Sequence, residues 1–256
     1  MLFFINMKLL SIEIPTCSKD IFEKFYKDNF RFWSKAKDKI VFNINFQGYT
    51  EDDIAKYISY TNSLGLEVHY CVSEYIKGSP LPSIREQTHQ IYPECPFNMT
   101  MDDDIAVLTE TYVDTVMKIV DIMCNDETIG VATIRNRYPS QDPIIFIDEG
   151  VQDPYTYGGI IFRNREDKRM CPPEYMDVVG LQDALFTLKK MSEGYKRLTC
   201  KIGDSHFHHY EIRKEYAPGM IRHNWKITDK PYNEIRRLIC YMMEHDLCNV
   251  FFKIPQ

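Results

Sequence analysis

The first hundred residues alternate between two spacings of hydrophobic side chains. Short apolar or β-branched runs at Lys8–Pro15, Lys39–Phe46 and Glu67–Val72 predict strands. Between them, apolar residues recur every three or four positions, which predicts helices over Asp20–Trp33 and from Thr50 to Gly65. Strands separated by helices of this length predict parallel β-α-β units with right-handed crossovers and helices on both faces of one sheet.

The ends of these two helices carry local signals. Asp20 and Glu23 form a D-x-x-E pair that can cap the start of the first helix. Thr50 and Asp53 predict a capping box at the start of the second, and Gly65 is placed to end it.

The same patterns continue through the rest of the chain. They predict further helices at Leu81–Tyr92, Thr111–Cys124, Asp183–Glu193 and Asn233–His245. They predict further strands at Asn98–Met101, Ile129–Ile134, Ile144–Ile147 and Gly158–Phe162. Around the third of these strands, Pro139–Tyr157 is rich in Pro, Gly and Asp and predicts a loop at the mouth of a site. Because no repeat or linker divides the sequence, we expect one α/β domain over residues 1–256.

Composition narrows the class of protein. With 44% hydrophobic and 27% charged residues, the 256-residue chain has ordinary globular usage. A net charge of −6 disfavours a protein whose main partner is a phosphate backbone. No stretch is long and apolar enough to cross a bilayer, and Met1–Leu10 fits a first strand better than a signal peptide. The eight cysteines are scattered without a C-x-x-C pair, so we expect reduced thiols and a cytoplasmic location.

The main chemical signal is the run of three acids, Asp102, Asp103 and Asp104, directly after a predicted strand. Ligands of open α/β sheets bind at the carboxyl ends of the strands, so these side chains are expected at that edge. Adjacent carboxylates repel one another, and oxygen ligands favour a divalent ion such as Mg²⁺ or Mn²⁺. The alternative is a solvated acidic turn that caps the following helix.

Several motifs follow one another in a familiar order. They are SIEIPTC at Ser11–Cys17, PSIREQ at Pro82–Gln87, FNMTMDDDI at Phe97–Ile105, GLQDALFTLKKMSEGYKR at Gly180–Arg197 and HFHHY at His206–Tyr210. Together they resemble the nucleotide-sugar-dependent glycosyltransferases of the GT-A fold, particularly the inverting family two. The hallmark of that family is a hydrophobic strand that runs into D-x-D or D-D-D.

The resemblance implies a single GT-A-like domain with a central, mostly parallel sheet. Residues 1–104 would form a Rossmann-like half that binds the nucleotide sugar, and residues 105–256 the acceptor and catalytic half. Asp104 would bind Mn²⁺ or Mg²⁺, and Asp102 would contact the ion or the ribose. The resemblance favours a UDP-sugar as the donor. The other residues that it implies contact the donor are Thr16, Asp103 and Arg85, with Arg85 at the diphosphate.

The resemblance also implies two roles further along the chain. Asp183 would be the general base that takes a proton from the acceptor hydroxyl, although an N-cap of its helix is an equal alternative. His208 or His209 would complete the coordination of the metal, with exposed loop histidines as the alternative. Gly158 and Gly159 are expected to allow close backbone approach near the site.

Four arginines stand near predicted strand ends and fit either an anionic acceptor or a solvated surface: Arg135, Arg137, Arg163 and Arg165. Asn45 and Gln47 stand where the family has paired acids. A non-catalytic nucleotide-sugar-binding module is therefore an alternative to the transferase, as is a metal-dependent phosphoryl-transfer or nuclease enzyme. The acceptor stays open between a glycan, a lipid-linked sugar, a protein and a modified DNA base.

Overall fold

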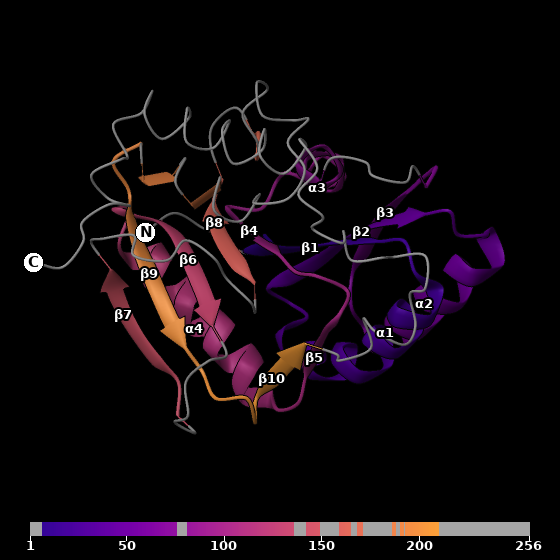
Figure 1. The fold of residues 1–256 in the computed structure, drawn as a ribbon, viewed down its shortest axis with the longest axis horizontal. Coiled ribbons are helices and arrows are strands. Elements are labelled where there is room, and N and C mark those ends of the chain that lie inside the picture. Colours follow the sequence, from indigo (N-terminus) through magenta and orange to yellow (C-terminus); the bar gives the residue numbers. More distant parts are fainter. Residues whose placement is uncertain are drawn as a thin grey trace, which may run out of the picture.

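The computed structural model describes residues 7–75, 81–135, 142–148, 159–164, 168–170, 186–187, 190–191 and 193–209. In these residues the chain forms an eight-stranded sheet with the order β3-β2-β1-β4-β8-β6-β9-β7 (Figure 1). The strands are β1 Leu10–Thr16, β2 Ile40–Gln47, β3 Val68–Ser73, β4 Phe97–Thr100, β6 Ile129–Arg135, β7 Ile144–Asp148, β8 Ile160–Arg163 and β9 Lys196–Lys201.

The first four strands are parallel, as the alternating pattern predicts. β1 lies between β2 and β4, and β2 continues the sheet to β3. The second half is mixed, because β8 runs antiparallel to both β4 and β6, while β6 and β9 are parallel and β7 closes the edge antiparallel to β9. The predicted α/β class with a mostly parallel central sheet is confirmed.

Four helices, α1 Lys19–Trp33, α2 Glu51–Ser63, α3 Leu81–His89 and α4 Glu110–Asn125, match the predicted ones closely. The capping box of Thr50 and Asp53 is present, and Gly65 follows α2 with φ of +70°. The predicted D-x-x-E cap of α1 is wrong. Ser18 is the N-cap residue, one position before the helix, and the Glu23 carboxylate instead contacts Lys27 and Lys56.

The two faces of the parallel half differ in chemistry. Phe42 and Phe46 of β2 point to α1, where they pack against Phe30 and Phe22, respectively. The alternate positions of β1, β2 and β4 face α3 and carry buried polar residues: Ser11, Glu13, Asn43, Asn45, Asn98 and Thr100. Figure 1 shows α1 and α2 on one side of this part of the sheet and α3 on the other. An apolar, aromatic core therefore lies on one face, and a buried polar layer on the other.

A separate two-stranded sheet lies beside the main one. The short strand β5, Ile105–Val107, pairs antiparallel with β10, Phe207–His209. The HFHHY motif is therefore partly a strand. The predicted helix over Asn233–His245 lies outside the described residues. In the described part of the chain, no helix is long and apolar enough to span a membrane.

Candidate donor-binding site

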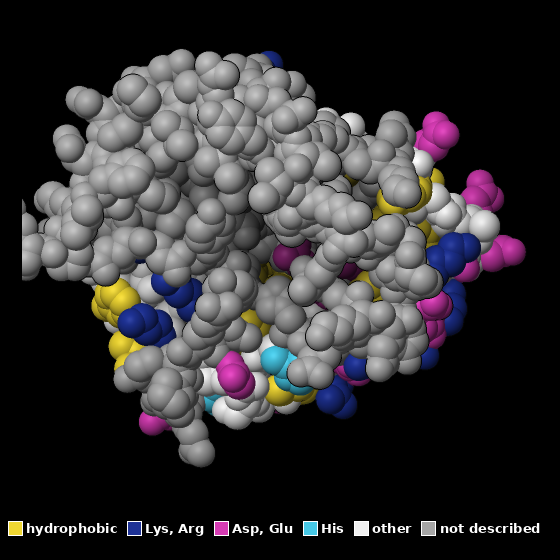
Figure 2. Space-filling view, in the orientation of Figure 1, with side chains coloured by type: hydrophobic (Ala, Val, Ile, Leu, Met, Phe, Trp, Pro, Cys, Tyr) yellow, Lys and Arg dark blue, Asp and Glu magenta, His cyan; other side chains and the backbone are white. Residues whose placement is uncertain are grey.

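The acidic run lies where the sequence places it. β4 ends at Thr100, two residues before Asp102, and all three acids follow within a short turn that leads into β5. Since β1 and β4 are parallel neighbours, Thr16 at the end of β1 lies at the same edge of the sheet. Figure 2 shows acidic side chains near the ends of β1 and β4, on the same face of the molecule as histidine side chains.

Arg85 of α3 contacts the first acid. One of its guanidinium nitrogens, Nη2, donates to the Asp102 carboxylate at 2.5 Å, and the other, Nη1, donates to the backbone carbonyls of Glu13 and Met101, both at 3.2 Å. Arg85 is 2% exposed, whereas the Asp102 side chain is 43% exposed. The buried cation therefore stands behind a carboxylate that faces outward, so Arg85 fixes the orientation of Asp102.

The second acid is held by a chain of hydroxyl groups. The Thr16 hydroxyl donates to the Asp103 carboxylate at 2.7 Å and lies 2.7 Å from the hydroxyl of Tyr49. Because the single Thr16 proton goes to Asp103, Tyr49 must donate to Thr16. Burial, the largest cause, raises the pKa of Tyr49, and the Asp103 charge adds to it. Tyr49 therefore keeps its proton and can donate it to the Thr16 hydroxyl.

The third acid, Asp104, is 4% exposed, which excludes the solvated acidic turn for this residue. It directly precedes β5, whose residue Ile105 pairs with His209 and whose Ala106 pairs with His208. The fold thus brings the histidine strand beside the acids, although about a hundred residues separate them in the sequence. The His208 side chain is exposed, and of His209 only the backbone is described. A neighbouring residue of the motif, His206, contacts the hydroxyl of Thr109 at 2.8 Å.

Among the described residues, no group of three Asp, Glu, His or Cys side chains converges to hold a metal ion. The chemistry of the acids still fits one kind of site. Mg²⁺ and Mn²⁺ bound together with a nucleotide are commonly held by one or two carboxylates, the remaining ligands being phosphate oxygens and water. Asp104 could supply such a carboxylate, with the Arg85-bound Asp102 next to it.

Gly159 makes room for this turn. Its φ is +123°, and a Cβ atom at this position would lie 2.5 Å from the Met99 side chain and 3.3 Å from the Thr100 carbonyl oxygen. Close approach of β8 to the end of β4 therefore requires glycine here, as expected from the sequence.

Other candidate residues are distributed differently. Asp183 lies outside the described residues, as do Gly158, Arg137 and Arg165. Downstream of Asp183, Phe186 is helical and packs on Phe162 of β8, with ring centroids 5.6 Å apart. Arg163 does not extend to a strand-end anion site, because its guanidinium donates to the carbonyl oxygens of Asp126, the C-cap residue of α4, and of Ile129 at the start of β6. Among the four arginines, this one therefore has a structural role.

The sequence interpretation missed Glu13, Tyr49 and His89. Glu13 and His89 form a fully buried pair in the polar layer between β1 and α3. A charged residue inside a β-branched strand is the signal that could have revealed Glu13. Tyr49 and His89 could not be found in the same way, because they lie 33 and 76 residues away from Thr16 and Glu13, which they contact.

No protein-family model and no curated protein matches this sequence. Solved structures with a similar fold exist. The mannosyltransferase PcManGT from Pyrobaculum calidifontis, in complex with GDP-Man and Mn²⁺, matches 93% of this chain and 68% of its own at a TM-score of 0.60 and 13% identity. The fold is of the GT-A type.

S. aureus TarS is a second structure similar to this GT-A-like chain. The longer TarS structure matches 93% of this chain at a TM-score of 0.57 and 17% identity, and the match covers 40% of TarS. The fragment 1–349 in complex with UDP matches 79% of this chain at a TM-score of 0.54 and 17% identity. This chain spans 60% of that fragment. At these identities the likeness concerns the fold.

Proposed function

We propose that the chain is a metal-dependent glycosyltransferase, which moves a sugar from a nucleoside diphosphate sugar to an acceptor hydroxyl with inversion. The observation that carries the proposal is the arrangement of the three acids at the carboxyl edge of a GT-A-like sheet. Arg85 and Thr16 hold the first two, and the third is buried beside the strand that bears the histidines. The structures of PcManGT with GDP-Man and Mn²⁺ and of TarS with UDP support the ligand class.

In this proposal residues 1–104 bind the donor. Asp104 would hold Mn²⁺ or Mg²⁺, with Asp102 beside it and His208 or His209 as a further ligand. The ion would neutralise charge that builds on the departing diphosphate. Thr16 and Asp103 would contact the nucleoside, and Arg85 would add positive charge behind Asp102. A UDP-sugar remains the favoured donor.

Residues 105–256 would supply the acceptor side. Asp183 would accept the proton of the acceptor hydroxyl while its oxygen attacks the anomeric carbon from the face opposite the leaving group. A single displacement of this kind inverts the anomeric configuration. The polar amides Asn45 and Gln47, in place of paired acids at the end of β2, keep a binding module without turnover as the alternative.

Calorimetry tests donor binding, the first step of the proposal. UDP-GlcNAc and GDP-Man are each titrated once in Mn²⁺ and once in excess chelator. We expect binding of at least one donor that is lost with the chelator. Release of the nucleoside diphosphate in the presence of candidate acceptors then separates a transferase from a binding module, and NMR of the product gives the anomeric configuration. Absence of metal-dependent binding to any nucleoside diphosphate sugar would overturn the proposal.

A further inference from the structure

The layer between α3 and the sheet is unusual for a parallel sheet. Strands that are covered on both faces are normally apolar on both, yet here the side facing α3 carries polar side chains at adjacent positions. In the register of the strands, Glu13 lies beside Asn43 on one side and Thr100 on the other. Contacts between α3 and this face are therefore directional hydrogen bonds and charges, which fix one relative position of helix and sheet more sharply than apolar packing does.

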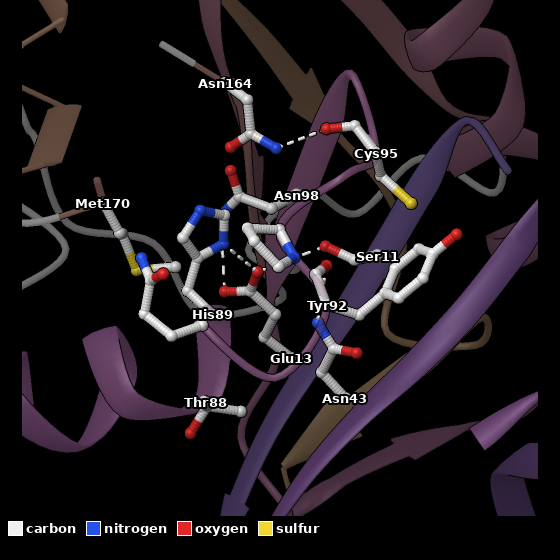
Figure 3. Close-up of polar contacts among 12 residues, drawn as sticks. Ser11, Glu13, Asn43, Thr88, His89, Tyr92, Cys95, Asn98, Asn164 and Met170 are labelled. Carbon is white, nitrogen blue, oxygen red and sulfur yellow. Dashed lines mark hydrogen bonds and ion pairs between the residues drawn. The ribbon is translucent and has the colours of Figure 1, made fainter. Parts of the chain in front are cut away.

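At the centre of this layer is an ion pair without solvent contact. His89 Nδ1 donates to the Glu13 carboxylate at 2.6 Å, and both side chains are 0% exposed (Figure 3). Ser11 and Asn98 also donate to this carboxylate, at 3.1 and 3.4 Å. Burying two charges is expensive, so the pair is favourable only while the partners keep this geometry. A small displacement of α3 would leave a buried charge without compensation.

Arg85 and His89 are four residues apart and so lie on one face of α3, toward β1. Glu13 contacts both of them, since its carboxylate accepts from His89 and its backbone carbonyl accepts from Arg85. The other end of the Arg85 guanidinium contacts Asp102. The placement of the helix on β1 thus determines how Arg85 meets the first acid of the site.

We propose that the Glu13–His89 pair positions Arg85 at the donor site, by fixing α3 on β1 so that the guanidinium holds Asp102 in its outward orientation. His89 and Glu13 are positioning residues, which act through Arg85 without touching the donor. The proposal rests on the donor-binding function proposed above. It makes donor affinity depend on a fully buried pair that contacts Arg85 through the backbone carbonyl of Glu13.

The charge state of His89 agrees with this role. Burial by itself lowers the pKa of His89, but the Glu13 carboxylate outweighs burial, and the net pKa is raised above the ordinary value. In the described part of the chain, the charged groups that face the ring are Glu13 on β1 and Glu86 on α3, and the Lys168 backbone carbonyl also favours the charged form. The charged imidazolium is therefore favoured over the neutral ring more than it is in a free histidine.

A double-mutant cycle of His89→Gln, Arg85→Met and the double variant tests the proposal. For each protein, Kd is measured for UDP and for GDP in Mn²⁺ at pH 6.5, roughly the ordinary pKa of histidine. We expect His89→Gln to weaken binding by about tenfold. In the Arg85→Met background the same change should have no further effect, because the residue that transmits it is gone. Thr88→Val is the matched control, since Thr88 is buried on the same helix but donates only to the Ile84 carbonyl. Its Kd should equal that of the wild type.

Two results would overturn the proposal: unchanged Kd in His89→Gln, or an equal loss in both backgrounds. Where His89→Gln does not fold cooperatively, Glu13→Gln carries the same test, because it removes the charge and keeps the size. If the wild type binds neither nucleotide, donor binding as proposed is wrong, and the effect of the Glu13–His89 pair on Arg85 is then measured in the free protein. Solvent exchange of the ¹⁵N-labelled Arg85 guanidinium should then be slow in the wild type and faster in His89→Gln; equal exchange would refute the positioning role.

Discussion

Arg85 and Asp102 form an ion pair that joins the interior of the protein to its candidate site. The guanidinium is almost fully buried, while the carboxylate that it contacts at 2.5 Å is nearly half exposed. Water can therefore reach the Asp102 carboxylate but not the Arg85 guanidinium. This asymmetry gives the pair two separable consequences, one for stability and one for binding.

Removing the acid should destabilise the protein, because Arg85 would keep its charge in the interior with fewer partners. For Asp102→Ala we expect a loss of about 2 kcal/mol in the free energy of unfolding, in the range for hydrogen bonds to charged groups. Urea unfolding measures it. Asp38→Ala, at an exposed loop acid, should change stability by no more than about 0.5 kcal/mol. An equally small loss in Asp102→Ala would show that Arg85 does not need this partner.

Gly159→Ala tests the close approach of β8 to β4. The added methyl group would lie 2.5 Å from the terminal methyl of Met99, which must move, and 3.3 Å from the backbone carbonyl oxygen of Thr100, at a φ of +123°. We expect a loss of about 3 kcal/mol in the free energy of unfolding, from clash and backbone strain together. Gly194→Ala is the control, because φ there is +88° but no atom lies within 4 Å of the new Cβ. It should lose only about 1 kcal/mol, and similar losses in both variants would remove the steric argument.

The Glu13–His89 pair predicts a pH dependence of stability. Because the pKa of His89 is raised above 6.5 in the folded protein, the folded state keeps a proton that the unfolded chain releases first. Its contribution is fully present below pH 6.5 and is lost as the pH rises through the folded pKa. The stability of the wild type relative to His89→Gln should therefore fall as the pH rises above 6.5. A difference that grows with pH would contradict the pair's charge state.

Local patterns predicted most of the framework. β1, β2 and β4 carry apolar residues at alternate positions, and the change from this pattern to three acids marks the end of β4 without knowledge of its neighbours. Helix α2 was also fully specified, since its cap and its closing Gly65 are within the segment itself. In each case the signal and the structure lie within the same few residues.

What the sequence did not predict depends on distant partners. β5 and β10 are three residues long and exist because they pair with each other across about a hundred residues. The start of α1 was misplaced because Asp20 and Glu23 satisfy the spacing of a cap, whereas Lys27 and Lys56 compete for the Glu23 carboxylate. The Glu13–His89 pair joins β1 to α3, and neither segment alone indicates that the other supplies a counter-charge.

Asp104→Asn tests the proposed metal ligand. The amide keeps the shape of the buried side chain but removes its charge. We expect the Kd of UDP in Mn²⁺ to rise by more than about tenfold, since loss even of groups that only support metal ligands costs 10- to 100-fold. A circular dichroism spectrum and a cooperative urea unfolding transition like those of the wild type separate loss of the ion from misfolding. Asp38→Asn is the control. Full metal-dependent binding by Asp104→Asn would exclude this residue as a ligand.

Asp183→Asn separates donor binding from transfer. If Asp183 accepts the proton of the acceptor hydroxyl, the amide should leave the Kd of the donor in Mn²⁺ unchanged and lower kcat by about 100- to 10,000-fold, the usual contribution of a general base. Asp204→Asn, at an exposed acid between β9 and β10, should keep full activity. An N-cap role for Asp183 predicts the reverse pattern: Asp183→Asn keeps both stability and turnover, because Asn caps a helix as well as Asp does, and only Asp183→Ala loses about 1 kcal/mol in the free energy of unfolding. Measuring kcat, donor Kd and unfolding on the same preparation therefore decides between the two roles.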